Sequence, residues 1–360
     1  MTNAVLNFVD RFLGRGEAAV TVPALDGALK PNNVLEQAPA GIAVEEPDNL
    51  VLTEAGLLFT SGPRLLKAEV GSHTIVREFP VTISALAVSQ GGAIAVAFGK
   101  TVQVFDEVAA ERPRVSTDVA TGITAFAFDG EASLLATVGS SKNGLDDWQA
   151  DLLNQEHAGS LWRVDLTSGA VSQLASKLAW PSGVIVAPDG NIIISEGWQK
   201  RLVRLDRNGK ILGQVIEDLP GYPGRISASP GGGYWLSIFA PRSQLIEFVL
   251  REPKYRKTMM AEVDKEFWIA PALRSGQSFR EPMQGGALKQ MGILKPWAPT
   301  RSYGLVIELS SGFVPVRSLH SRAGGRRHGI TSAVEGGDVL WATSKGGHEV
   351  IAVTLERAGI

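Results

Sequence analysis

Short apolar runs, split by a polar turn that contains glycine, recur along the chain. The copies are NLVLTEAGLLFTSG at 49–62, ALAVSQGGAIAVAF at 85–98, VIVAPDGNIIISEGW at 184–198, RISASPGGGYWLSI at 225–238, ITSAVEGGDVLWATS at 330–344 and the looser ITAFAFDGEASLLATV at 123–138. Two apolar runs around such a turn are typical of a β-hairpin. Six hairpins, each followed by further strand-like runs, predict an all-β, six-bladed β-propeller.

The repeat also sets expected blade boundaries. The blades are predicted at 41–79, 82–117, 121–174, 179–216, 222–319 and 328–354. The last copy runs out of chain after its third strand, so an N-terminal strand at 18–22 is expected to complete it and remove an open edge. A short helix is predicted over 3–14. The chain therefore divides into an N-terminal segment, 1–40, and the propeller, 41–360.

Two of the repeats contain insertions. The third blade carries a polar loop at 140–158, where the acidic pair Asp146 and Asp147 is expected on a solvated surface. The fifth blade carries a longer, partly helical segment, 242–299. Insertions of this length in a compact repeat favour a lid or a binding loop, and a partly ordered surface flap is the alternative.

Composition narrows the class of protein. The formal net charge is −2, which implies neither nucleic acid nor an anionic membrane as a partner. The chain has no cysteine, which excludes disulfides and thiolate chemistry and suits a reducing compartment. The first thirty residues lack a long apolar run, so no signal peptide or transmembrane helix is expected. A cytoplasmic location and a small-molecule partner are the resulting expectations.

Several segments resemble one family. PSGVIVAPDGNIIISEGWQKRLVRLD, LPGYPGRISASPGGGYWLSIFAPR, YGLVIELSSG and KNGLDDWQADLLNQEHAGSLWRVDLTSG are similar to segments of the strictosidine synthase-like proteins. The resemblance covers nearly the whole chain from about residue 41. The wider group includes gluconolactonases, paraoxonase-type arylesterases and a plant Pictet–Spengler enzyme, so the resemblance implies the propeller fold more firmly than a reaction.

The resemblance also implies a divalent cation, usually Ca²⁺, at the mouth of the central channel. The positions that match the family's ligands are Asp48 with Asn49 beside it, Ser182, and the pair Gly224 and Arg225. Calcium needs several converging oxygen atoms, and an arginine cannot ligate a metal. The ligand set Asp48, Asn49 and Ser182 is therefore expected to hold Ca²⁺ weakly or not at all.

Arg225 is then open to two interpretations. In the first, its guanidinium replaces the cation and either pairs with Asp48 across the channel or grips a ligand oxyanion. In the second, the side chain points along the surface and the site has decayed. The resemblance places the active glutamate of the plant Pictet–Spengler enzyme near Thr331, which carries no carboxylate, so that activity is not expected.

Other candidates depend on whether they reach the same mouth. His328 could face the channel as a general base or lie on a solvent-exposed loop. Glu196 and Trp198 match a family motif that could serve the ligand or simply pack a blade, and Tyr222 frames the Arg225 position as in the family.

Two functions follow. The first is a hydrolase of carboxylic esters or lactones, or a relative with a diverged reaction; the second is a non-catalytic propeller that binds a small ligand or a protein. For the enzyme, the candidate catalytic residues are Arg225, His328 and Asp48, and the candidate substrate-binding residues are Ser182, Tyr222, Glu196, Trp198 and Thr331.

Overall fold

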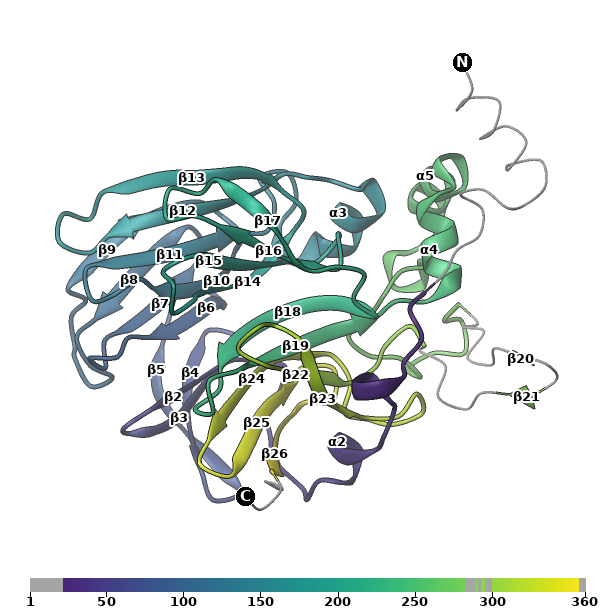
Figure 1. The fold of residues 1–360 in the computed structure, drawn as a ribbon, viewed down its shortest axis with the longest axis horizontal. Helices are drawn as coiled ribbons and strands as arrows, with labels where there is room; N and C mark the ends of the chain where they lie inside the picture. The colour runs from purple at the N-terminus through teal and green to yellow at the C-terminus, as the bar shows by residue number, and fades with distance from the viewer. Residues whose placement is uncertain (1–21, 283–288, 291–292, 295–299, 356–360) are drawn as a thin grey trace.

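The computed structural model describes residues 22–282, 289–290, 293–294 and 300–355. Six four-stranded antiparallel sheets are arranged around a central axis, and the first strand of each sheet contacts the first strands of its neighbours (Figure 1). The predicted six-bladed β-propeller is therefore confirmed.

The first blade consists of β2 (Pro47–Thr53), β3 (Gly56–Ser61), β4 (Arg64–Glu69) and β5 (Ser72–Glu78). The second consists of β6 (Ile83–Val88), β7 (Ile94–Phe98), β8 (Thr101–Phe105) and β9 (Val115–Asp118). The third consists of β10 (Ile123–Phe128), β11 (Ser133–Val138), β12 (Gly159–Asp165) and β13 (Val171–Leu178). The fourth blade consists of β14 (Pro181–Val186), β15 (Ile192–Glu196), β16 (Arg201–Leu205) and β17 (Ile211–Ile216). The fifth consists of β18 (Gly221–Ala228), β19 (Tyr234–Pro241), β22 (Leu305–Leu309) and β23 (Pro315–His320). The sixth consists of β24 (Ile330–Gly336), β25 (Val339–Ser344), β26 (Glu349–Thr354) and β1 (Ile42–Ala43).

The last blade is closed by an N-terminal strand, as expected, but at another position. Ile42 pairs with Val350, so β1 supplies the fourth strand. Most of the strand predicted at 18–22 lies outside the described residues, and Val22 has no regular structure. The helix predicted over 3–14 also lies outside the described residues. The helical elements near the start of the described chain are a 3₁₀ turn, Gly27–Leu29, and α2 (Val34–Gln37).

The hairpin repeat builds the core between blades. Gly92 and Gly190 have φ angles of +89° and +79°, a region that glycine enters without a steric penalty, and each closes the turn of an inner hairpin. The apolar positions on either side of these turns are buried, with Ala95 and Leu134 fully enclosed in one cluster that joins the second and third blades. Burying each such leucine stabilises the fold by roughly 2 kcal/mol.

All six inner hairpins share an irregularity at one end. Their registers shift between Asp48 and Val51, Ile83 and Ala85, Ile123 and Ala125, Pro181 and Gly183, Pro223 and Ile226, and Ile330 and Ser332. A bulge bends its strand and redirects backbone and side-chain groups. The repeat thereby places irregular backbone from every blade around one end of the channel.

The two insertions pack against each other at one side of the propeller. The third-blade loop forms α3 (Trp148–Asn154), and the fifth-blade segment forms α4 (Gln244–Leu250) and α5 (Pro253–Glu262) (Figure 1). Leu153, Ile246 and Met259 bring the three helices into one buried cluster. Lys265 forms an ion pair with Asp147, with 2.8 Å between Nζ and Oδ1, so this acidic residue is bound to the other insertion.

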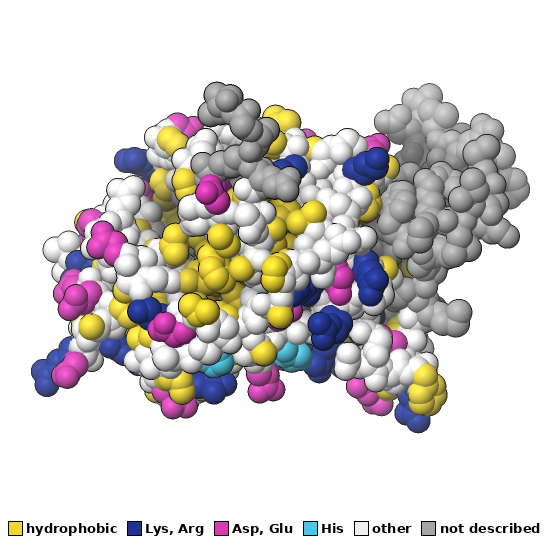
Figure 2. Space-filling model, turned by 90° about the horizontal axis from the view of Figure 1, so that it is seen from below, with side chains coloured by type: hydrophobic (Ala, Val, Ile, Leu, Met, Phe, Trp, Pro, Cys, Tyr) yellow, Lys and Arg dark blue, Asp and Glu magenta, His cyan; other side chains and the backbone are white. Residues whose placement is uncertain are grey.

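Seen from below, hydrophobic side chains gather in a central patch, and charged side chains surround it (Figure 2). Within the described part of the chain, no helix combines the length and the apolar character that crossing a membrane requires.

Candidate functional site

A cavity of about 340 Å³ lies at the irregular end of the channel. Every blade contributes to its wall from the start of an inner strand. The contributing residues are Asp48 on β2, Ser84 on β6, Thr124 on β10, Ser182 on β14, Arg225 on β18 and Thr331 on β24. The structure therefore brings together four of the predicted site residues, Asp48, Ser182, Arg225 and Thr331.

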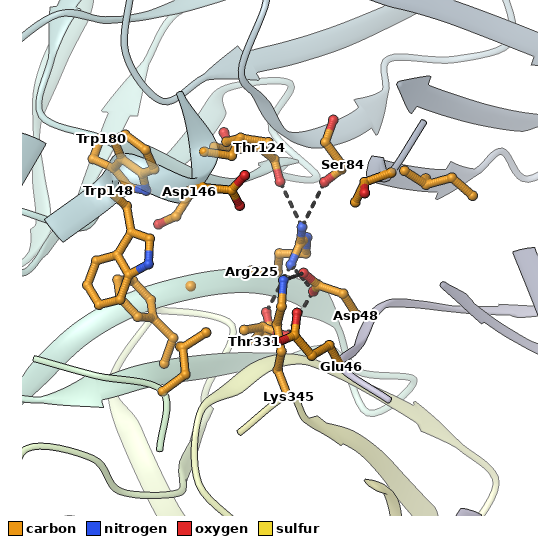
Figure 3. Close-up of a pocket in the computed structure, with 17 residues that line it drawn as sticks. Glu46, Asp48, Ser84, Thr124, Asp146, Trp148, Trp180, Arg225, Thr331 and Lys345 are labelled. Atoms are coloured by element: carbon orange, nitrogen blue, oxygen red, sulfur yellow. Dashed lines mark hydrogen bonds and ion pairs between the residues drawn. The ribbon is translucent and has the colours of Figure 1, made fainter. Parts of the chain in front are cut away.

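The guanidinium of Arg225 lies on the axis and bonds to four other blades (Figure 3). Its Nη1 donates to Asp48 Oδ1 at 2.5 Å and to the Thr331 carbonyl at 3.4 Å. Its Nη2 donates to the carbonyls of Ser84 and Thr124, each at 3.0 Å. Arg225 therefore pairs with Asp48, one of the alternatives predicted from the sequence, and it does not point along the surface.

These bonds limit what Arg225 can do. A guanidinium has two hydrogens on each Nη, and all four are directed at protein acceptors. None of these four remains for a ligand oxyanion in this arrangement, and Nε, which has no partner in the described residues, is buried. The structure thus favours a positioning role for Arg225 over the oxyanion role that was the other alternative.

Asp48 is held as firmly as its partner. Besides Arg225, its carboxylate accepts a hydrogen bond of 2.8 Å from the Thr331 hydroxyl and lies 3.2 Å from Lys345 Nζ. Burial alone would raise the pKa of Asp48, but the charges of Arg225 and Lys345 and the Thr331 hydrogen bond outweigh it and lower the pKa to about 2. Asp48 is therefore a fixed anion and a poor proton acceptor.

The residues present do not fit a Ca²⁺ site. Both Asp48 oxygens face cations, and the amide of Asn49 is directed into the blade, where Nδ2 donates to the Thr60 hydroxyl at 2.9 Å. The Ser182 hydroxyl donates to the Pro223 carbonyl at 2.5 Å. A Cβ on Gly224 would lie 2.6 Å from Ser237 Oγ, so the backbone leaves no room there for a ligating side chain. No group of three or more His, Cys, Asp or Glu side chains in the described residues is arranged to hold a metal.

One wall of the cavity is aromatic. Trp198 stacks between Trp180 and Trp148, with ring centroids 5.1 Å and 6.2 Å apart. Trp148, Trp180 and Phe239 line the cavity, whereas Trp198 lies behind them. The Trp198 Nε1 donates to Asp151 on α3 at 2.7 Å, which fastens the third-blade insertion to this wall. The wall offers apolar surface to a ligand and faces the charged groups across the cavity (Figure 3).

Three charged residues at the mouth were not among the predicted site residues. Glu46, Asp146 and Lys345 all line the cavity (Figure 3). No hydrogen bond or ion pair holds the carboxylate of Glu46 or Asp146 within the described residues. Asp146 is exposed, as expected for a solvated surface, and the folding of the insertion places that surface at the mouth of the cavity.

A positional signal in the sequence could have identified part of this set. Glu46 and Trp180 each precede the proline that begins an inner strand, and each has a positive φ angle. Lys345 directly follows β25, the second strand of the last inner hairpin. Residues immediately outside the hairpin copies therefore reach the same level of the channel.

His328 is not at the channel mouth. It is buried, its Nδ1 lies 2.7 Å from the Ser302 hydroxyl, and its Nε2 lies 2.8 Å from the Arg322 carbonyl. Burial lowers the pKa of His328. Both expectations, a channel-facing base and a solvent-exposed loop residue, are wrong, because the segment at 302 folds over the ring.

Three further candidates are packing residues. Glu196 is buried, accepts from the Ala179 amide at 2.8 Å and pairs with Arg201 at 2.6 Å. Tyr222 is fully buried among aromatic rings and does not line the mouth cavity. Neither they nor Trp198 line the mouth cavity, and their contacts favour the blade-packing alternative.

Comparison with known proteins places these features in a wider group. No protein-family model matches the chain. Adipocyte plasma membrane-associated protein of Bos taurus is 26% identical over 196 residues, which cover 52% of this chain and 41% of that protein. Strictosidine synthase-like 6 of Arabidopsis thaliana is 30% identical over 130 residues, covering 36% and 35%. The matched segments thus span less than half of these relatives.

Solved structures share the fold at low identity. The luciferin-regenerating enzyme aligns over 89% of this chain and 94% of its own, with a TM-score of 0.54 and 14% identity. Regucalcin of Agrobacterium tumefaciens, described as calcium-binding, aligns over 91% and 95% with a TM-score of 0.52 and 13% identity. A gluconolactonase of Xanthomonas campestris aligns over 89% and 88%, also at 0.52 and 13%. By sequence the chain is a relative of the adipocyte plasma membrane-associated and strictosidine synthase-like proteins, and by fold it is a six-bladed propeller like the gluconolactonases and regucalcin, as the resemblance predicted.

Proposed function

We propose that the chain hydrolyses the ester or lactone bond of a small molecule at the channel mouth, without a divalent cation on the axis. The observation that carries the proposal is the composition of the cavity. Lys345 and the carboxylates of Glu46 and Asp146, which have no partner in the described part of the chain, surround a space walled by Trp148 and Trp180. The gluconolactonases share only the fold with this chain, so the reaction rests on these side chains.

The chemistry needs a polarised carbonyl and an activated water. Lys345 Nζ donates one hydrogen bond to Asp48. Its two other hydrogens remain for the oxyanion that forms when water attacks the carbonyl carbon. Glu46 or Asp146 takes the proton from that water, and the proton then passes to the departing alcohol oxygen. Arg225 acts by fixing Asp48, which in turn holds Lys345.

A non-catalytic binding propeller is the second candidate. One observation favours it: the candidate residues Asp48, Ser182 and Arg225 already have protein partners for their charged or hydroxyl groups. In that case the cavity binds a small organic acid or ester and releases it unchanged.

The test uses 4-nitrophenyl acetate and δ-valerolactone as substrates, with and without EDTA. Hydrolysis should be unaffected by EDTA, and Lys345→Met should lower kcat/KM by roughly 100-fold through loss of the oxyanion donor. Lys67→Met, on a blade-one strand away from the cavity, is the matched control. Loss of activity in EDTA, recovered with Ca²⁺, would refute the proposal. Calorimetric binding without turnover would favour the second candidate.

A further inference from the structure

A second cavity, the outer chamber, opens beside the one at the channel mouth. Its volume is about 280 Å³, and it lies along the fifth-blade insertion between residues 266 and 281. Glu46, Trp148, Leu273 and Lys345 line both cavities. Figure 3 shows Trp148 facing Glu46 and Lys345 across the shared opening. The two chambers therefore form one cleft that suits an elongated ligand.

The outer chamber contains a buried cation with unused donors. Arg301 is only 5% exposed and lines the chamber. Its Nε donates to the Ala270 carbonyl at 3.2 Å, and its own carbonyl accepts from the Ala272 amide at 2.8 Å, so both the side chain and the chain around it are fixed. Within the described residues, neither terminal amino group has a hydrogen-bond or ion-pair partner. A buried charge without a partner is costly, which points to a ligand that supplies one.

The surroundings of Arg301 restrict the charge of that ligand. Glu281 and Glu266 line the same chamber and act on Arg301 electrostatically, but no ion pair joins them to it in the described part of the chain. Glu281 instead accepts from the backbone amides of Gly276 and Gln277, at 2.9 Å and 2.7 Å. Two carboxylates nearby disfavour a doubly charged group such as a phosphate dianion. A single carboxylate matches the paired donors of a guanidinium.

We propose that the outer chamber is a carboxylate subsite, in which Arg301 binds the far acid group of an elongated ester or lactone whose carbonyl lies in the inner cavity. The placement of the carbonyl rests on the proposed hydrolysis; the carboxylate subsite does not. Trp148 and Leu273 at the shared opening would contact the aliphatic chain between the two polar ends.

The first experiment measures binding, which needs no turnover. Monomethyl adipate carries one carboxylate, and dimethyl adipate is its neutral counterpart. Calorimetric titration should show the monoacid binding 10- to 100-fold more tightly, as expected for a charge-assisted, two-pronged hydrogen bond. The second experiment measures turnover, comparing kcat/KM for mono-4-nitrophenyl adipate with that for the neutral 4-nitrophenyl hexanoate. The same preference should appear there.

The decisive variant is Arg301→Lys, which keeps the charge but loses the planar pair of donors. It should reduce the preference for the monoacid about tenfold. Arg256→Lys is the matched control, because Arg256 is 7% exposed, donates to the Leu250 carbonyl and lines neither chamber. It should lose comparable stability in a thermal melt and keep the wild-type preference. If Arg301→Lys does not fold, Arg301→Gln takes its place and is judged by the same ratio of monoacid to diester affinity.

Each outcome decides one point. Equal binding of the monoacid and the diester by the wild type overturns the subsite, as does a preference that survives in Arg301→Lys. An Arg301-dependent preference in binding, without hydrolysis of either nitrophenyl ester, supports the subsite and overturns the proposed reaction.

Discussion

The cleft contains two arginines in opposite hydrogen-bonding situations, Arg225, which is partly buried, and Arg301, which is buried. Arg225, on the channel axis, directs all four terminal hydrogens at Asp48 and three backbone carbonyls. Arg301, in the outer chamber, uses only Nε, and its terminal amino groups have no partner within the described residues. The resemblance to metal-binding relatives drew attention to Arg225, yet the available donors belong to Arg301.

This difference in hydrogen bonding indicates that the charge of Arg225 stabilises the structure, whereas the charge of Arg301 is available to bind a ligand. At the axis, bulged inner strands supply carbonyls and Asp48 supplies the counter-charge, so both terminal amino groups of Arg225 have acceptors before any ligand arrives. In the outer chamber the carboxylate of Glu281 accepts hydrogen bonds from backbone amides and forms no ion pair with Arg301 in the described residues. The same residue type therefore closes the channel at one position and leaves a site open at the other.

The largest expected effect comes from removing the counter-charge at the axis. Asp48→Asn leaves Arg225 and Lys345 facing each other without an anion, and should lower the free energy of unfolding by about 3 kcal/mol. Urea denaturation measures it. Asp106→Asn removes an exposed partner of Arg114 and should cost less than about 1 kcal/mol. Equal losses in the two variants would show that the axis pair is not special.

A somewhat smaller effect should appear in acid. The folded-state pKa of Asp48, about 2, lies below its ordinary value of 3.8, so its stabilising contribution is present above pH 3.8 and is lost as the pH falls toward 2. The shift corresponds to about 2 kcal/mol. Unfolding free energies of the wild type and Asp48→Asn, measured from pH 5 to pH 2.5, should converge as the pH falls. Parallel curves would contradict the assignment.

Replacing Arg225 or Arg301 with lysine compares how much each guanidinium contributes to the stability of the fold. An ammonium group cannot reach four acceptors placed around a guanidinium, so Arg225→Lys should cost about 2 kcal/mol of stability. Arg301→Lys gives up only the bond to the Ala270 carbonyl and should cost about 1 kcal/mol. Thermal and urea unfolding of both variants provide the test. The reverse order would mean that Arg301 is the structural residue.

The smallest expected effect is on metal binding. Arg225→Asp adds a carboxylate at the axis, but Lys345 remains and the Ser182 hydroxyl is still committed to the Pro223 carbonyl. Calorimetric titration with Ca²⁺ should therefore detect no micromolar binding. Micromolar affinity in this single variant would show that the remaining residues do form a calcium site.

The sequence predicted the parts of the molecule that follow the repeat. The hairpin period predicted the six blades and their shared axis, and the family resemblance assigned Asp48, Ser182, Arg225 and Thr331 to the channel mouth, where the structure has them. The pairing of Arg225 with Asp48 was one of the alternatives that the sequence left open, and the structure selects it.

What the sequence did not predict lies outside the repeat. Asp146 reaches the mouth, and His328 becomes buried, through insertions whose folding no periodic pattern specifies. The closing strand was expected at 18–22, but the pairing is made by Ile42 and Ala43, which are too few to show an alternating pattern. Arg301 adjoins the fifth-blade insertion, and only the tertiary structure shows that its donors are unused.

Side-chain NMR of the ¹⁵N-arginine-labelled protein, titrated with monomethyl adipate, compares the two guanidinium groups directly. Spectra of Arg225→Lys and Arg301→Lys assign the two signals. The Arg301 resonance should shift with ligand concentration, while the Arg225 resonance should stay in place with slowly exchanging hydrogens. A ligand-dependent shift of Arg225 with an unmoved Arg301 would contradict the division between a closed axis and an open outer chamber.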